Sequence, residues 1–532
     1  MSKIRVAYFS MEIGLDSAMP TYAGGLGVLA GDLLRAAADV GAPVAGVTLL
    51  HRQGYFRQRL GPDGTQTELP AAWRPEDRLE PLPPRATVTI EGRPVLVRAW
   101  RSVLRSEPGH EVPVYFLDTQ LPENAAWDRA LTDRLYGGDD RYRLCQEAVL
   151  GLGGAGILHA LGHVNVRTYH MNEGHSALLA LGLLEERMGT RGLAAAGEAD
   201  LAAVRDLCVF TTHTPVPAGL DRFPMDLVTG VLGPDRAAAL ENLGCCTGES
   251  PSRLNMTFLA LFCSRYINGV SMRHDEVSES MFPRYPINAI TNGVHAATWT
   301  APPFQALFDR HVPEWRHDNL YLRYAIDLPV EEVRTAHREA KAALLAEVKR
   351  RTGRGLDPER LTLGFARRAA GYKRADLIFA DLERLRRISR SAGRVQVVFA
   401  GKAHPRDEGG KEVIRRVFEA AAALGDELPV VYLEEYDMDL ARLLCAGSDV
   451  WLNTPLKPHE ASGTSGMKAA LNGVPSLSVL DGWWIEGHVE GVTGWAIGGR
   501  EPESDPAEEV AAFYDKLERV VIPTFYGPPV LF

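Results

Sequence analysis

The chain has 532 residues, a hydrophobic content of 45% and a formal net charge of −10 at pH 7. This length exceeds what one compact core accommodates, so we expect two or more domains. The acidic balance argues against nucleic acid or an anionic membrane surface as a partner, and no stretch approaches the roughly 20 apolar residues of a membrane span. Because the first residues also lack the apolar core of a signal peptide, we expect a cytoplasmic location.

Short β-branched runs alternate with longer amphipathic runs through the first part of the chain. This alternation is typical of parallel sheets joined by crossover helices. The predicted strands are Arg5–Phe9, Val44–Leu50, Pro113–Leu117, Val166–His170 and Cys208–Thr212, and the predicted helices are Leu26–Val40, Cys145–Leu161 and His175–Met188.

A long charged helix pattern at Val330–Arg351 precedes a second series of the same kind. Two successive series predict an α/β protein with two Rossmann-like lobes, residues 1–328 and 329–532, that face a central cleft. The second series predicts strands at Leu361–Ala366, Val395–Ala400, Pro429–Leu433 and Asp449–Asn453, and helices at Ala375–Ile388, Lys411–Leu424 and Leu440–Ala446.

Polar clusters follow several of these strands, and ligands collect beyond the carboxyl ends of strands in open parallel sheets. Strand-end placement in both lobes is what a cleft between them requires. The clusters are Asn172–His175, Thr212–Pro215, Arg367-Arg368, Tyr372–Arg374 and Gly401–His404.

A glycine-rich turn, Tyr22–Gly27, precedes a helix pattern. Glycines let backbone N–H groups approach a phosphate or a sugar closely, although the same residues also make a plain tight turn. The turn does not have the GxGxxG spacing of a dinucleotide-binding loop.

Four cations lie within eight residues at Arg367, Arg368, Lys373 and Arg374. Arginine forks suit phosphate oxygens and lysine adds a point charge, so this density fits a phosphate site. The alternative is a solvated start of a helix.

His175 and His213 lack the partner spacing of a zinc site, and we expect no metal. Either histidine could bond a sugar hydroxyl or serve a structural role. Asn292 lies in a turn signal and is also a candidate sugar-binding amide. Glu460 would suit a general acid, but a glycosidase needs a second facing carboxylate and none is evident.

The segment His459–Gly473 combines a carboxylate, hydroxyls, glycines and Lys468 in a turn that runs into a helix pattern. Free N–H groups and the helix dipole at such a turn attract negative charge. An exposed helix lysine is the simplest interpretation of Lys468 by itself.

Taken together and in this order, these motifs resemble the α-glucan phosphorylases, which include the glycogen, starch and maltodextrin enzymes. The similarity extends from Val6–Glu12 to Val479–Gly482 and is closest to the short bacterial and archaeal branch. Glu460–Gly473 is the most specific match, with Ser465-Gly466 where the long enzymes have Gly-Asn.

The resemblance implies a glycosyltransferase of the GT-B architecture with pyridoxal phosphate bound covalently at Lys468. It implies catalytic roles for Lys468, Arg368, Lys373 and His213, with Arg368 and Lys373 holding the substrate phosphate. The implied cofactor contacts are Gly25, Arg367, Trp299 and Thr464 besides Lys468, and the implied substrate contacts are Gly24, Leu26, His213, Asn292, Tyr372, Glu460, Ser462, Gly463, Glu173 and His175.

The implied reaction is phosphorolysis of terminal α-1,4-linked glucose from an α-glucan by inorganic phosphate, releasing α-glucose 1-phosphate with retention. The cofactor phosphate would exchange a proton with the substrate phosphate, so paired carboxylates are not needed. The alternatives are a sugar-nucleotide glucan synthase without pyridoxal phosphate, and a non-catalytic glucan-binding protein. The resemblance is compatible with a homo-oligomer and implies, in related enzymes, a further C-terminal helix that braces the lobes.

Overall fold

The structure is a computed structural model that describes residues 4–216, 219–247, 252–501 and 505–528. It is a mixed α/β protein whose contacts form two compact units. The first unit comprises Met1–Phe56, Pro70–Val270 and His274–Thr291, and the second comprises Arg57–Leu69, Ser271–Arg273 and Asn292–Phe532. Contacts therefore group residues 292–328 with the second unit, whereas a folding-domain boundary at residue 328 stays a prediction.

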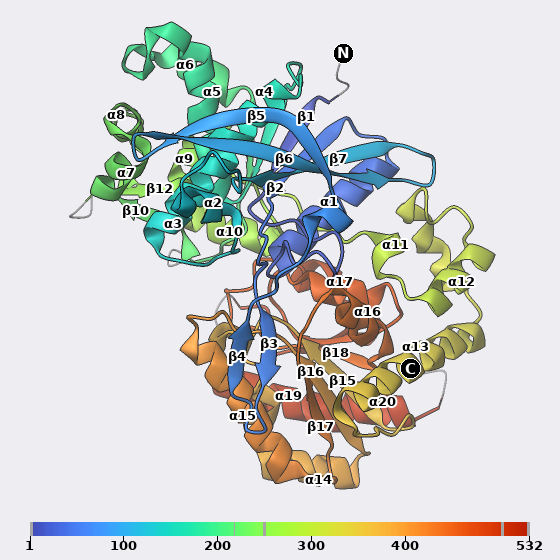
Figure 1. The fold of residues 1–532 in the computed structure, drawn as a ribbon. Coiled ribbons are helices and arrows are strands. Elements are labelled where there is room, and N and C mark those ends of the chain that lie inside the picture. The colour runs from blue at the N-terminus through green and yellow to red at the C-terminus, as the bar shows by residue number, and fades with distance from the viewer. Residues whose placement is uncertain (1–3, 217–218, 248–251, 502–504, 529–532) are drawn as a thin grey trace. The chain divides into compact units, whose positions relative to one another are not determined.

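Within the described residues, the first unit is built on a nine-stranded sheet in the order β14-β13-β9-β8-β1-β2-β7-β6-β5 (Figure 1). The strands from β14 to β7 pair in parallel, and β6 pairs antiparallel with both β7 and β5. The strands are β1 (Val6–Phe9), β2 (Val44–Leu49), β5 (Glu80–Ile90), β6 (Arg93–Arg105), β7 (Glu111–Asp118), β8 (Thr168–Asn172), β9 (Cys208–Thr211), β13 (Tyr266–Gly269) and β14 (Asn288–Ala289).

Helices cover both faces of this sheet because its strand residues alternate between two apolar cores. On β7, Val112, Val114 and Phe116 pack in one core with residues of α1 (Gly25–Asp39), whereas Tyr115 and Leu117 join the other core. This is the period-2 alternation of a strand buried on both faces. The other helices of the unit are α2 (Ala126–Arg129), α3 (Asp140–Ala148), α4 (Gly154–Ala160), α5 (Leu178–Met188), α6 (Glu198–Arg205), α7 (Met225–Leu232), α8 (Pro234–Asn242), α9 (Met256–Phe262) and α10 (Met272–Met281).

The five strands predicted in this unit are present, and three features depart from the prediction. The helix predicted at His175–Met188 begins at Leu178 as α5, after a 3₁₀ turn at Gly174–Ser176. The helix predicted at Cys145–Leu161 is divided by a π-helical turn at Val149–Gly153 between α3 and α4. The long β5–β6 hairpin was not predicted, although it forms the antiparallel edge of the sheet (Figure 1). Its strands carry many prolines and arginines, which weaken the strand pattern read from sequence.

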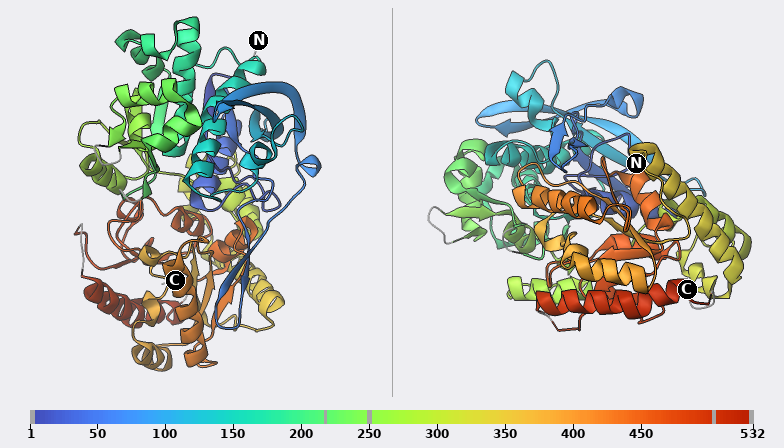
Figure 2. Two further views of the ribbon diagram at one scale, coloured as in Figure 1. Left: turned by 60° about the vertical axis from the view of Figure 1, so that its left-hand side comes forward. Right: turned by 90° about the horizontal axis from the view of Figure 1, so that it is seen from below.

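The second unit has, in the described residues, a six-stranded sheet in the order β17-β16-β15-β18-β19-β20, and its strands pair in parallel. Figure 2 shows the yellow-to-red helices of this unit around these strands. The four strands predicted in this series are confirmed. The strands are β15 (Leu361–Ala366), β16 (Val395–Ala400), β17 (Val430–Leu433), β18 (Val450–Asn453), β19 (Ser476–Val479) and β20 (Gly494–Ile497).

Two apolar cores again cover this sheet. Leu363 of β15 packs in one core with residues of α14, α15 and α19, while Val398 of β16 packs in the other with residues of α13, α16 and α17. The helices are α11 (Ala296–Trp299), α12 (Pro302–His311), α13 (Val330–Thr352), α14 (Leu382–Ser391), α15 (Glu408–Leu424), α16 (Met438–Gly447), α17 (Thr464–Ala470), α18 (Trp484–Gly487), α19 (Pro506–Lys516) and α20 (Ile522–Tyr526).

The helix predicted at Ala375–Ile388 is present, but the predicted first residue was wrong. Asp381 accepts a hydrogen bond from the backbone N–H of Arg384, so α14 begins at Leu382. An aspartate in this capping position fixes where a helix begins. A 3₁₀ turn, Leu377–Phe379, precedes it.

A hairpin of β3 (Arg57–Leu60) and β4 (Gln66–Leu69) belongs to the second unit although its residues come early in the chain. The buried amides of Gln58 and Gln66 donate to the carbonyl oxygens of Gly401 and Ala403, at 2.8 and 2.9 Å. These side chains satisfy backbone groups that follow β16. No helix among the described residues is long and apolar enough to cross a membrane.

Candidate functional site

Glu460 is the centre of a buried ionic cluster in the second unit. Its two carboxylate oxygens accept hydrogen bonds from Lys373 Nζ at 2.8 and 2.7 Å, and Arg367 lies 2.7 Å from the same carboxylate. Arg367 also donates to the side-chain oxygen of Asn453. All four side chains are at most 10% exposed, so this is a desolvated cluster in which two cations share one carboxylate.

The topology of the sheet brings this cluster together. Arg367 follows β15, Asn453 ends β18, and Asp481 follows β19, and these three strands are neighbours in the sheet. Asp481 accepts hydrogen bonds from the backbone N–H groups of Glu460 and Gly482, at 2.9 and 3.0 Å. The cluster therefore forms at the carboxyl edge of a parallel sheet, where ligands bind in open α/β folds.

The two buried acids of this cluster have opposite pKa shifts. Burial raises the pKa of Glu460, but the charges of Arg367 and Lys373 outweigh it and lower that pKa to about 2. Burial raises the pKa of Asp481 to about 6, and the two N–H donors only partly offset this effect. At neutral pH Glu460 is therefore firmly ionised, whereas Asp481 titrates just below neutrality.

Lys468 lies in α17 with its ammonium group 3.8 Å from the centre of the Trp299 ring. Both side chains are buried, at 7% and 1% exposure. Asn472 holds the two segments together, because its amide donates to the carbonyl oxygens of Trp299 and Lys468 at 2.9 and 2.8 Å and accepts from Ala301 N–H at 2.7 Å. The expectation of an exposed helix lysine is thus wrong.

The turn before α17 is shaped by Gly463, which has φ of +88° and directly precedes the helix. A residue with a Cβ is strained in this left-handed conformation. Ser462 is buried, and its hydroxyl oxygen has no hydrogen-bond partner among the described residues. Thr464 is half-buried at the first position of the helix.

Three other predicted residues of this unit lie at different depths. Arg368 is exposed directly after the buried Arg367. Tyr372 is half-buried, and Lys373 Nζ lies 4.6 Å from the centre of its ring. Asn292 is half-buried, and no contact of its amide with the Glu460 cluster is present among the described residues.

In the first unit, the glycine turn is held by Glu12. Oε2 of Glu12 accepts hydrogen bonds from the backbone N–H groups of Ala23 and Gly24, at 2.6 and 3.2 Å. A Cβ added to Gly27 would lie 2.7 Å from that oxygen, whereas a Cβ on Gly24 or Gly25 would meet nothing within 4 Å. The turn therefore has one glycine that makes room for Glu12 and two that border open space, with Leu26 half-buried beside them.

A chain of buried and half-buried polar groups supports the Glu12 carboxylate. The Tyr136 hydroxyl donates to Glu12 Oε1 at 2.8 Å, and the Arg143 guanidinium lies 4.9 Å from the centre of the Tyr136 ring. Arg143 forms ion pairs with Glu147 and Asp221, at 2.8 and 2.9 Å. Such a network fixes the orientation of the Glu12 carboxylate and hence of the turn.

His213 and Glu173 form a second polar group at the ends of β8 and β9; β8 lies next to β1 in the sheet, and β9 lies next to β8. His213 Nε2 lies 2.6 Å from the Asn172 side-chain oxygen, so this nitrogen carries the proton. Glu173 accepts from His213 N–H and from the Thr214 hydroxyl, at 2.7 and 3.0 Å. Burial lowers the pKa of His213 to about 3, which makes it a neutral hydrogen-bonding group at pH 7.

His175 has a different environment from His213. It is 2% exposed, and its Nε2 accepts a hydrogen bond from the backbone N–H of Met11 at 2.9 Å. Burial lowers the pKa of His175 well below its usual value. The ring therefore joins β1 to the segment after β8, while its predicted contact with substrate stays a prediction.

Sequence reasoning missed several residues of these clusters, among them Glu12, Asp481 and Asn472. Glu12 and Asp481 each follow a strand, which was the available signal, but their partners are backbone N–H groups that sequence does not reveal. Asn472 carried no signal, because its role depends on the approach of Trp299. No group of three or more metal-ligating side chains is found in the described part of the chain.

The chain matches the family described as carbohydrate phosphorylase over residues 233–492. It is 38% identical to a maltodextrin phosphorylase of Thermococcus litoralis, over 98% of this chain and 66% of that protein. It is 39% identical to a glycogen phosphorylase of Mycobacterium tuberculosis, over the same shares of each, so it spans slightly less than two thirds of these relatives.

A glycogen phosphorylase of Aquifex aeolicus is 38% identical over 98% of this chain and 80% of that protein. Identity at this level over most of both chains is family-level similarity, and it confirms the resemblance carried by the motifs. The chain belongs to the carbohydrate phosphorylase family.

Proposed function

We propose that this protein is a glucan phosphorylase that releases α-glucose 1-phosphate from terminal α-1,4-linked glucose with inorganic phosphate, and that pyridoxal phosphate is bound at Lys468. The buried Lys468, held against Trp299 and Asn472, carries the proposal. A buried lysine on an apolar aromatic surface is suited to bind an aldehyde, because little water competes for its amine.

Other features fit the same cofactor. The hydroxyl of buried Ser462, which has no hydrogen-bond partner in the described part of the chain, offers a polar contact close in sequence to Lys468. Gly24 and Gly25 border open space at the start of a 15-residue helix, where backbone N–H groups favour a phosphate. We infer that Lys468, Trp299, Thr464, Arg367 and Gly25 would hold the cofactor, within the two facing lobes of the GT-B architecture.

When bound, pyridoxal phosphate supplies a phosphate group that exchanges a proton with the substrate phosphate. Arg368 is exposed, with its guanidinium available to bind inorganic phosphate. Lys373 is oriented by Glu460 and adds positive charge, while Glu460 offers its carboxylate to sugar hydroxyls. Preplaced charges of this kind stabilise the charge that develops in the transition state.

Polar residues of the first unit are suited to bind the glucose hydroxyl groups of the glucan. His213 is neutral and donates from Nε2 to Asn172, and we infer that it faces a glucose hydroxyl. Gly24, Leu26, Glu173 and His175 are proposed as further glucan contacts in this unit, and Asn292, Tyr372, Ser462 and Gly463 as contacts in the second unit. The sugar-nucleotide synthase alternative has no support in the comparisons, because the named relatives reported above are phosphorylases.

The test is borohydride reduction of the purified protein after incubation with pyridoxal phosphate, followed by peptide mapping. We expect a pyridoxyl group on Lys468 and, in parallel, release of glucose 1-phosphate from maltodextrin only when phosphate is present. If Lys468 is labelled but no phosphorolysis is detected, the proposed activity is rejected and the proposed cofactor site is retained. An unlabelled Lys468 would reject both.

A further inference from the structure

A second polar site lies at the same edge of the first unit's sheet as the glycine turn, but beyond strands β2 and β7. A cavity of about 540 Å³ is lined there by Arg52, Arg98 and Arg129 together with Glu76, Gln120 and Asp133. Arg52 follows β2, and Asp118 is the last residue of β7. The carboxyl ends of parallel strands are where open α/β sheets bind ligands, and this volume suits a small molecule.

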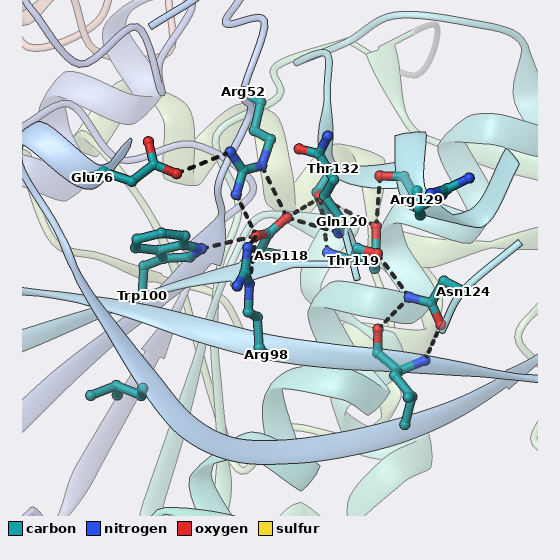
Figure 3. A network of polar contacts seen from close by, with 12 residues as sticks. Arg52, Glu76, Arg98, Trp100, Asp118, Thr119, Gln120, Asn124, Arg129 and Thr132 are labelled. Atoms are coloured by element: carbon teal, nitrogen blue, oxygen red, sulfur yellow. Dashed lines mark hydrogen bonds and ion pairs between the residues drawn. The ribbon is translucent and has the colours of Figure 1, made fainter. Parts of the chain in front are cut away.

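Asp118 organises two of the arginines (Figure 3). It is fully buried, and it accepts hydrogen bonds from Arg52 at 2.8 Å, Arg98 at 2.9 Å and the Trp100 indole N–H at 2.9 Å. Arg98 also stacks at 4.8 Å from the centre of the Trp100 ring. Both guanidinium groups are thus held rigidly, which is the preorganisation that an anion site needs.

Each of these arginines keeps donors that Asp118 does not use. Arg52 bonds Asp118 through Nε and one terminal nitrogen, and its other terminal nitrogen lies 3.8 Å from Glu76, beyond hydrogen-bond distance. Glu76 is 52% exposed, so the pair is weak and a bound anion can displace it. Arg98 likewise binds Asp118 through Nε and one terminal nitrogen.

Arg129 supplies a third guanidinium. It ends α2, it is exposed, and its side chain has no partner among the described residues. The unpaired Arg129 and the side-chain amide of Gln120 line the same cavity as the two anchored arginines. A tetrahedral phosphate carries more negative charge than a carboxylate and presents three or more acceptor oxygens, so it suits three guanidinium groups at one cavity better than a carboxylate ligand does.

The carboxylates of the cavity narrow the choice of ligand. Asp133 accepts from the Gln53 amide at 3.0 Å and, with Glu76, offers acceptors beside the arginines. Three arginines and the carboxylates of Asp118, Asp133 and Glu76 leave little net charge, so local geometry rather than long-range attraction must select the ligand. A molecule with both a phosphate group and hydroxyl donors satisfies both kinds of group.

We propose that this cavity is a binding site for the phosphate group of a small phosphorylated molecule, separate from the proposed catalytic site. Arg52, Arg98 and Arg129 bind the phosphate oxygens, while Asp133 and Glu76 accept from hydroxyl groups of the same ligand. The site depends on residues of the first unit alone, and it does not rest on the proposed phosphorolysis.

The experiment is arginine modification of the whole protein with phenylglyoxal, read at individual residues by peptide mass spectrometry. Arg129 is the reporter, and Arg167 is the matched control, because it is an exposed arginine at the opposite, amino-terminal edge of the same sheet. The added probes are inorganic phosphate, α-glucose 1-phosphate, and sodium chloride at equal ionic strength.

We expect both phosphate probes to slow modification of Arg129 at least fivefold in a saturable manner and to leave Arg167 unchanged. Half-protection at a lower concentration of glucose 1-phosphate than of phosphate would assign the site to a sugar phosphate, whereas the reverse order would assign it to the free anion. Equal labelling of Arg129 with and without the probes, or equal protection by chloride, would overturn the site.

A variant gives an independent measurement. Arg129→Gln removes a side chain without a partner among the described residues, so it is expected to fold normally. In the Arg368→Gln background, where the proposed catalytic phosphate site is impaired, Arg129→Gln should weaken binding of radiolabelled phosphate at least tenfold in equilibrium dialysis. Arg167→Gln in the same background should leave it unchanged, and identical binding curves for the two variants would refute the proposal.

Discussion

The ammonium group of Lys468 lies 3.8 Å from the centre of the Trp299 indole ring, although the two residues are far apart in the sequence. Asn472 fixes this pair by bonding the carbonyl oxygens of both residues. The aromatic surface shields the amine and limits the directions in which it can point. This relationship gives the proposed cofactor lysine a defined position before any ligand is bound.

Replacing Trp299 should therefore reduce the affinity for the cofactor more than it reduces the stability of the fold. Trp299 orients the Lys468 amine and is a proposed contact of the cofactor, and an aromatic contact is worth about 1 kcal/mol beyond the area that it buries. Trp299→Leu is therefore expected to raise the dissociation constant of pyridoxal phosphate roughly tenfold, while Trp299→Phe has a smaller effect. Absorbance titration measures this constant. Trp315→Leu, which removes another buried tryptophan of the same unit, is the control and should lower stability without changing cofactor affinity.

Glu460→Gln should destabilise the second unit strongly. It leaves the buried Arg367 and Lys373 without their carboxylate, and breaking a buried ion pair in this way costs roughly 3–5 kcal/mol. Urea denaturation at pH 7 measures the loss. The exposed Glu419→Gln is the matched control and should change stability by less than about 0.5 kcal/mol.

The same variant should change the acid response. Because the pKa of Glu460 is lowered from 4.5 to about 2, its ion pairs stabilise the native state above pH 4.5 and are lost as the pH falls towards 2. The difference in unfolding free energy between the wild type and Glu460→Gln should therefore shrink over that range. A difference that stays constant with pH would contradict the assigned ionic cluster.

Asp481 should produce a pH dependence of the opposite sign. Its pKa is raised from 3.8 to about 6, chiefly by burial, so the native state binds a proton that the unfolded state has released between these values. Asp481 therefore lowers the stability of the wild type as the pH rises through this window, by up to about 3 kcal/mol. Asp481→Asn removes the effect, and urea unfolding of both proteins between pH 4 and pH 7 measures it.

Glu12→Gln should impair catalysis through the glycine turn. An amide can accept from only one oxygen, so it cannot keep the hydrogen bonds from Ala23 and Gly24 on one oxygen and from the Tyr136 hydroxyl on the other with equal strength. We expect kcat for phosphorolysis to fall roughly 10–100-fold, with a smaller change in KM for the glucan.

Two variants separate positioning from general damage in this experiment. Tyr136→Phe removes only the support of Glu12 and should reduce kcat less than Glu12→Gln does. The exposed Glu123→Gln should have no effect. If Glu12→Gln retains full kcat while its stability falls, Glu12 has a structural role only.

Much of the fold could be predicted from sequence because buried parallel strands carry a strong local signal. Leu361–Ala366 and Val395–Ala400 have the bounds that their β-branched and aromatic runs predicted. The β5–β6 hairpin could not be predicted from sequence, because its prolines and arginines interrupt the alternation of apolar and polar residues that identifies a strand. The π-helical turn at Val149–Gly153 likewise has no sequence signature of its own.

Local patterns in the chain pointed to the residues of the proposed site: a lysine in a glycine- and hydroxyl-rich turn, cations after a strand, and a glycine turn before a helix. These features are local in the chain, so spacing reveals them. The pairing and the burial of these groups follow from the three-dimensional fold alone: Glu460 pairs with Arg367 and Lys373, Lys468 with Trp299, Glu12 with the N–H groups of the turn, and Arg52 and Arg98 with Asp118. The physical reason is that charge pairing and desolvation depend on strands that are adjacent in the sheet but distant in the chain, and no local pattern encodes that adjacency.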